Sequence, residues 1–170
     1  MSDNNAGINK VGETIIRKHM MYAMAGAAVP VPLVDLTAVT AIQLDMLKQL
    51  AHAHGVTFHA GSSKAFVTSV SATLASNMAA RLGASVIKLI PFVGPLVGGA
   101  AQALFTGAST YALGRFVNDR FATGHDLDSL DMDKVKQELH KHYQHGRELA
   151  EKWRQPNSQT QDESTDNQEK

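Results

Sequence analysis

A long stretch without any charged side chain, residues 89–114, lies between two basic residues in the second half of the chain. About 20 helical residues span the hydrocarbon core of a bilayer, so this stretch is long enough to do so. A proline corner interrupts it near its start, at Pro91, Gly94 and Pro95. Proline lacks a backbone donor and clashes with the preceding turn, so one unbroken helix is not expected. The pattern predicts a helix ending near residue 90, a tight corner, and a second apolar helix over residues 96–121.

A similar corner, formed by Pro30 and Pro32, lies near the N-terminus. Residues before a proline avoid the helical region, so the chain is expected to turn there. The preceding helix is predicted over residues 8–28. Its buried face is expected to contain residues at helical spacing, namely Ile8, Val11, Ile15, Ile16 and His19.

A second helix is predicted over residues 32–54, with Gly55 as its C-terminal stop. Asp35 falls in its first turn, where a carboxylate meets the positive end of the helix dipole. The predicted buried stripe has a polar residue in its middle and consists of Leu36, Val39, Gln43, Met46 and Leu50.

A third helix, residues 64–82, is predicted after a connection at 56–63 and is rich in Ala, Ser and Thr. Small residues allow helices to approach closely. The same packing role is expected for the glycines of the apolar stretch, which are Gly94, Gly98, Gly99, Gly107 and Gly114. Two helical hairpins, each turning at a proline corner, can pack as a four-helix bundle. The expected fold class is therefore all-α.

The C-terminal part is acidic and contains one more predicted helix, residues 131–154, after a turn in which Ser129 or Asp131 is the candidate cap. Its apolar seam is expected to contain Met132, Val135, Leu139, His142, Gly146, Leu149 and Trp153. Such a seam fits an amphipathic helix lying on the core, or a helix that binds a partner. The predicted division is a disordered start (1–7), an apolar helical domain (8–124), the acidic turn and helix (125–154) and a disordered polar tail (155–170).

Composition and motifs exclude several kinds of function. The chain has no cysteine, and its 16 basic residues balance its 16 acidic residues. The basic charge is too sparse for nucleic-acid binding, and the N-terminus lacks a secretory pattern. Neither a phosphate-binding GxxxxGK[ST] loop, an HExxH motif nor a GxSxG motif occurs. The chain has eight histidines, and six of them form two groups: His52, His54 and His59, and His140, His142 and His145. The grouped histidines are expected to be solvated, because their pairs lack the i, i+4 spacing of metal ligands on a helix. No enzyme activity, metal or cofactor is expected.

Two segments, residues 15–56 and 88–117, together carry a family resemblance. Their matching features are the two proline corners, Asp35, the Gln43-x-x-Met46 pair and Gly55. They resemble the bacterial GTPase-associated domain of unknown function that also occurs in YcjF-like proteins, and the resemblance covers about residues 13–123. It implies an all-helical module that accompanies GTPases and is often associated with membranes. This chain has no GTPase domain of its own, so the resemblance implies a GTPase acting in trans.

Three hypotheses follow for the function. The first is a non-enzymatic membrane-associated module at the cytoplasmic membrane that partners a GTPase. The second is a soluble cytoplasmic scaffold, or a homo-oligomer, that buries its apolar faces in a protein partner. The third is a helical hairpin that inserts into membranes with the Pro91–Pro95 corner as its tip.

Overall fold

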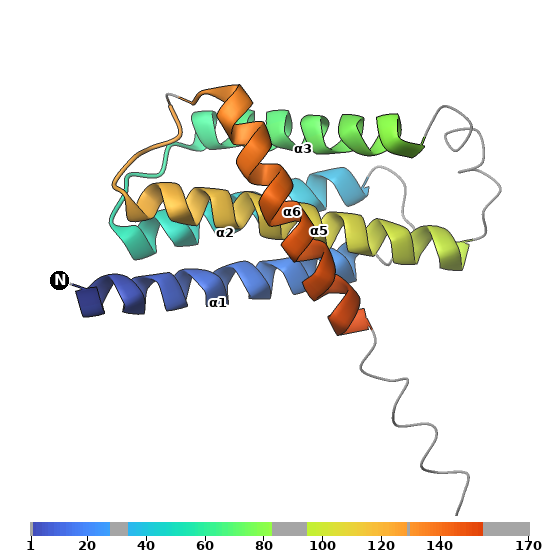
Figure 1. Cartoon of the computed structure of the whole chain (residues 1–170), viewed down its shortest axis with the longest axis horizontal. Coiled ribbons are helices and arrows are strands. Elements are labelled where there is room, and N and C mark those ends of the chain that lie inside the picture. Colours follow the sequence, from blue (N-terminus) through green and yellow to red (C-terminus); the bar gives the residue numbers. More distant parts are fainter. Residues whose placement is uncertain (1, 28–33, 83–94, 129, 155–170) are drawn as a thin grey trace, which may run out of the picture.

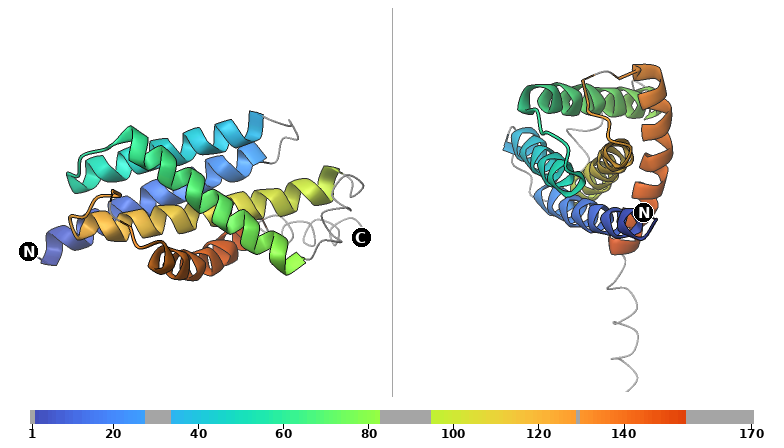
Figure 2. Two further views of the ribbon diagram at one scale, coloured as in Figure 1. Left: turned by 90° about the horizontal axis from the view of Figure 1, so that it is seen from above. Right: turned by 90° about the vertical axis from the view of Figure 1, so that its left-hand side faces the viewer.

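Five helices and no strand make up the part of the chain that the computed structural model describes, which is residues 2–27, 34–82, 95–128 and 130–154 (Figure 1). The helices are α1 (Ser2–Ala27), α2 (Val34–His54), α3 (Ala60–Leu82), α5 (Pro95–Ala122) and α6 (Met132–Arg154). The first four run alternately in opposite directions along the long axis, and α6 crosses α5 obliquely (Figures 1 and 2). Helix α5 is central because it contacts each of the other four. The prediction of an all-α bundle with a C-terminal amphipathic helix is confirmed.

The ends of α2 and α6 follow the local signals in the sequence. Gly55 has a φ of 67°, a conformation that glycine adopts without strain, and Val56 N donates to Ala51 O across the turn at 2.9 Å. At the start of α6, Asp131 Oδ1 accepts from the backbone N–H groups of Asp133 and Lys134 at 3.1 and 3.4 Å. Asp131, one of the two candidates, therefore caps this helix.

Two helices begin earlier than the sequence predicted. Helix α1 begins at Ser2 rather than residue 8, since extending a formed helix adds one hydrogen bond for each residue that is ordered. Helix α3 begins at Ala60 rather than residue 64. The first helical hydrogen bond runs from Ser63 N to His59 O at 2.9 Å, so the Gly-Ser-Ser segment that was expected to be a connection is helical.

The buried face of α1 also differs from the prediction. Ile16 and His19 are buried as expected, but the side chain of Val11 is exposed (51%). The face that meets the bundle consists of Gly12, Ile16, His19, Met20, Ala23 and Ala27. It is rotated relative to the predicted face because small residues, and not only large apolar ones, form the contact with α5.

Glycines lie at the crossings of α5 with α1 and α6. A Cβ atom on Gly114 would lie 2.8 Å from Ile16 Cγ1 and 2.9 Å from Met46 Sδ. A Cβ atom on Gly146 of α6 would lie 2.9 Å from Tyr111 Cβ and 3.0 Å from Ala108 O. The packing role predicted for Gly114 is confirmed, and Gly107 serves in the same way against Met24. The helices can approach this closely because no side chain stands between them.

Charge is distributed unevenly along the bundle. The alternating directions bring the last turns of α1 and α3 and the first turns of α2 and α5 to one end (Figure 1). The parts of the four helices toward this end contain no Asp, Glu, Lys or Arg. These parts are residues 19–27 of α1, 36–44 of α2, 65–80 of α3 and 95–114 of α5. We call this end the uncharged end. Two charged residues lie beyond these segments, in the terminal turns at this end: Asp35 near the start of α2 and Arg81 near the end of α3.

Candidate functional site

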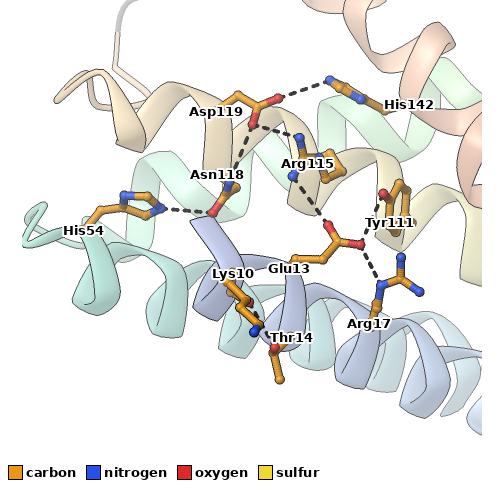
Figure 3. A network of polar contacts seen from close by, with 10 residues as sticks. All are labelled: Lys10, Glu13, Thr14, Arg17, His54, Tyr111, Arg115, Asn118, Asp119 and His142. Atoms are coloured by element: carbon orange, nitrogen blue, oxygen red, sulfur yellow. Dashed lines mark hydrogen bonds and ion pairs between the residues drawn. The ribbon is translucent and has the colours of Figure 1, made fainter. Parts of the chain in front are cut away.

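The charged side chains at the other half of the bundle form a network centred on Glu13 of α1 (Figure 3). Its carboxylate accepts a hydrogen bond from Arg17 Nε at 2.6 Å, one helical turn away. It also accepts hydrogen bonds from two residues of α5, Arg115 at 3.4 Å and the hydroxyl of Tyr111 at 3.5 Å. The side chains of Glu13 and Arg115 are 26% and 27% exposed, so this ion pair between helices is only partly screened by water.

The network continues from α5 to α6 and α2. Arg115 pairs with Asp119 one turn further along at 3.3 Å, and Asp119 lies 3.6 Å from Nε2 of His142 on α6. The neighbouring Asn118 is fully buried, and its Oδ1 lies 2.9 Å from Nε2 of His54 on α2. The side chain of Asn118 lies against Gly12, in the space that the Cβ atom of any other residue at position 12 would occupy. Four helices are thus joined by polar contacts.

Burial changes the acidity of two groups in this network. Desolvation raises the pKa of Tyr111, and the nearby Glu13 carboxylate raises it further. Burial lowers the pKa of His142, although the Asp119 carboxylate opposes that shift. Both shifts favour the neutral form of the group.

The arrangement of these groups fits a structural link better than a reaction centre. Glu13 faces two guanidinium groups, and Asp119 faces a guanidinium and an imidazole. Such pairing fixes helices relative to one another and leaves no free carboxylate to act as a base. Among the described residues, no cluster of three His, Asp or Glu has the arrangement of a metal site.

A second polar contact joins α1 to α2. His19 is 1% exposed, and its Nε2 lies 3.0 Å from Asp45 Oδ2. Gln49 Nε2 donates to the same carboxylate oxygen at 2.7 Å. The expectation that the grouped histidines are solvated is wrong for His54 and His142, which are partly buried, whereas His19 is buried as its place on the predicted face of α1 indicated. They hold polar contacts between helices that sequence spacing does not reveal.

The structure brings together two of the residues singled out in the sequence. Gln43 is 3% exposed, and its Nε2 donates to Thr110 Oγ1 of α5 at 3.2 Å. Met46, one turn later, is fully buried and has its sulfur beside Gly114. The Gln43-x-x-Met46 pair is therefore part of the contact between α2 and α5.

The remaining predicted residues are not brought together by described contacts. Asp35 is the second residue of α2, Pro95 is the first residue of α5, and Gly98 and Gly99 follow within the next turn. Proline is well suited to the first position of a helix, which explains why α5 includes it. Pro30, Pro32, Pro91 and Gly94 lie outside the described residues, so both corners remain predictions.

Several residues of the network were missed by the sequence analysis. Glu13 with Arg17, and Arg115 with Asp119, have the i, i+4 spacing of helical ion pairs, which is a visible signal. Their joining through Glu13 and Arg115, which are 102 residues apart, had no signal in the sequence.

A shallow groove of about 360 Å³ lies between α3 and the segment that leads into α6. Its lining consists of Ser62, Ala65, Phe66, Ser69, Leu127, Asp128, Leu130 and Met132. Asp128 is its single ionisable residue, so the groove offers apolar contact and little chemistry.

None of the described helices combines the length with the hydropathy that crossing a membrane requires. In α5, glycine and hydroxyl-bearing residues lower the mean hydropathy of its uncharged part, residues 95–114.

Comparison with known proteins identifies the family. Residues 5–148 match the model of the family described as "Domain of unknown function (DUF697)". The chain is also similar to a protein of Magnetospirillum gryphiswaldense called "Magnetosome membrane protein 22", with 31% identity over 150 residues. That alignment covers 88% of this chain and 77% of the relative. No solved structure matches. The resemblance is thus confirmed for a bacterial domain of unknown function, and the chain belongs to the DUF697 family.

Proposed function

We propose that this protein is a non-enzymatic, membrane-associated helical module that acts as an accessory partner of a GTPase in trans. The observation that carries the membrane part is the uncharged end, where four helix halves without ionisable Asp, Glu, Lys or Arg side chains meet. Apart from Asp35 and Arg81 in the terminal turns, this end can approach lipid without the cost of desolvating charge. A relative that is called a magnetosome membrane protein supports the same proposal.

The proposed mode of association is peripheral contact at the cytoplasmic membrane. The described helices are not apolar enough to cross a bilayer. Polar contacts such as the one between Glu13 and Arg115 hold the opposite half of the bundle together. The bundle would therefore meet the membrane as a folded unit, through the surface of its uncharged end.

Sedimentation with vesicles of bacterial polar lipids tests the membrane part. We expect the intact chain to bind without detergent, and to bind less when Ala101→Glu and Gln102→Glu add charge at exposed positions of the uncharged end. Gln137→Glu with His140→Glu adds carboxylates at exposed positions of α6 and is the matched control. Equal binding of all three proteins, or failure of the intact chain to bind, contradicts the proposal.

The GTPase part rests on the resemblance over residues 13–123, since the sequence contains no phosphate-binding loop of its own. Affinity capture from detergent-solubilised membranes of the native host tests it. We expect a GTPase among the captured proteins, retained more strongly in one nucleotide state than in the other. Capture of copies of this chain alone would favour the homo-oligomer instead.

A further inference from the structure

The outer face of α1 is unlike the rest of the described surface. Three large hydrophobic side chains of the described residues stand out as exposed, and all three lie on this face: Val11 (51%), Met21 (51%) and Tyr22 (48%). They span about three helical turns, or roughly 16 Å along the axis. Packing against α2 and α5 does not cover them, because those helices meet the opposite face of α1.

The same face carries cations and no carboxylate. Its exposed members between residues 7 and 25 are Gly7, Lys10, Val11, Thr14, Lys18, Met21, Tyr22 and Ala25, at helical spacing along one side. The ammonium of Lys18 lies 5.8 Å from the centre of the Tyr22 ring, so charge and aromatic surface are adjacent. Glu13, by contrast, points toward Arg115 of α5 (Figure 3).

Lysine stems and tyrosine rings with apolar neighbours are the composition of a helix that lies in the interface of a membrane. We infer that the outer face of α1 is the surface that contacts anionic lipid headgroups, with Met21 and Tyr22 entering the acyl boundary. This inference rests on the proposed membrane association and specifies its orientation. It places α1 along the membrane surface, where its last, uncharged turns meet the lipid.

Charge and shape favour lipid over other occupants. A second copy of the chain would set Lys10 and Lys18 against the same lysines, with no carboxylate on the face to balance them. A peptide would need a groove, and the shallow groove described above lies at α3, on a different side of the bundle from α1. A fluid anionic surface adapts to a convex helix and attracts both lysines.

Binding to phosphatidylcholine vesicles with and without phosphatidylserine tests the contribution of charge. Each lysine at an anionic surface contributes about 1 kcal/mol, so Lys10→Gln with Lys18→Gln is expected to weaken partitioning roughly 30-fold. Lys64→Gln with Lys141→Gln removes the same charge from exposed positions of α3 and α6, and is expected to leave partitioning nearly unchanged.

Fluorescence with brominated lipids tests the orientation. Trp153 on α6 is the single native tryptophan and serves as the internal reference. Tyr22→Trp is compared with the intact chain, in which Trp153 emits alone, and is expected to add emission that brominated acyl chains quench. Vesicle binding with an unquenched Trp at position 22, or with equal effects of the two lysine pairs, overturns the inference and leaves membrane association standing. If the variants lose a protein partner but bind vesicles normally, the face is a protein contact and the inference is wrong. Absence of any vesicle binding overturns both proposals.

Discussion

His19 and Asp45 form a polar contact across the α1–α2 interface, with 3.0 Å between His19 Nε2 and Asp45 Oδ2. The other ring nitrogen, Nδ1, lies 2.8 Å from Ile15 O, which can only accept a hydrogen bond. An ionised carboxylate is also only an acceptor, so both contacts are hydrogen bonds when both ring nitrogens carry hydrogen. The histidine is buried, whereas the Asp45 side chain is 58% exposed. The α1–α2 interface is thus stabilised by a hydrogen bond from a buried imidazole to a carboxylate that is exposed to water.

We predict that His19→Leu raises the pKa of Asp45 toward its ordinary value. The hydrogen bond from His19 is the largest cause of the lowered pKa, ahead of those that involve Gln49 and Lys48. NMR titration of the carboxyl carbon measures the change, and Lys48→Met is the control because its charge contributes least. An unchanged pKa in His19→Leu would show that the contact is absent in solution.

The same shift has a consequence for stability in acid. Because the pKa of Asp45 is lower in the folded chain than in the unfolded one, its contribution is complete above the unfolded value of about 3.9. The contribution is lost as the pH falls through the folded value. We expect the free energy of unfolding of His19→Leu to depend less on pH below about 4 than that of the natural sequence.

His142 gives a second pH dependence, at higher pH. Burial lowers its pKa, so the unfolded chain takes up a proton at a pH where the folded chain does not. The stabilising effect is complete above the unfolded value of about 6.5 and is lost as the pH falls toward the folded value. Urea unfolding measures the free energy of unfolding at pH 7.5 and at pH 5.5. We expect this free energy to change less between the two pH values for His142→Gln than for the natural sequence. His140→Gln, at an exposed position of the same helix, should behave like the natural sequence.

Local sequence signals predicted the elements well, and contacts between distant elements poorly. Gly55 and Asp131 mark helix ends through bonds with their neighbours, so a short window contains the information. The burial of His19 was predicted from helical spacing, but its contact with Asp45 depends on the rotation of α1 against α2, which is set by residues far away in the chain. Glu13 could be paired with Arg17 from spacing, but its contact with Arg115 requires the packed bundle.

Substitutions at Gln43 and Thr110 test whether a buried amide stabilises the contact between α2 and α5. Its Nε2 bonds to Thr110, but its Oε1 has no hydrogen-bond partner among the described residues. Gln43→Leu removes an unpaired carbonyl, so we expect unfolding free energy to stay equal or to rise by about 1 kcal/mol. Thr110→Val in the natural background leaves the amide unpaired and is expected to cost about 1–3 kcal/mol.

A double-mutant cycle separates this effect from packing. Thr110→Val should cost much less when combined with Gln43→Leu, because no buried amide is then left without a partner. Additive losses would mean that water satisfies the amide in solution.

Substitution of Gly146 by alanine tests how closely α5 and α6 approach each other. An Ala side chain there would meet Tyr111 Cβ at 2.9 Å and Ala108 O at 3.0 Å, and neither atom can move without shifting α5. Overpacking costs about 1–3 kcal/mol, against a gain of about 1 kcal/mol in helix propensity, so Gly146→Ala is expected to destabilise the fold. Gly7→Ala in α1 is the control, since nothing lies within 4 Å of the added atom and only the propensity gain remains. Urea unfolding followed by Trp153 fluorescence reports the docking of α6 directly. If both variants are stabilised alike, the two helices lie further apart than the structure shows, and glycine at position 146 has no packing role.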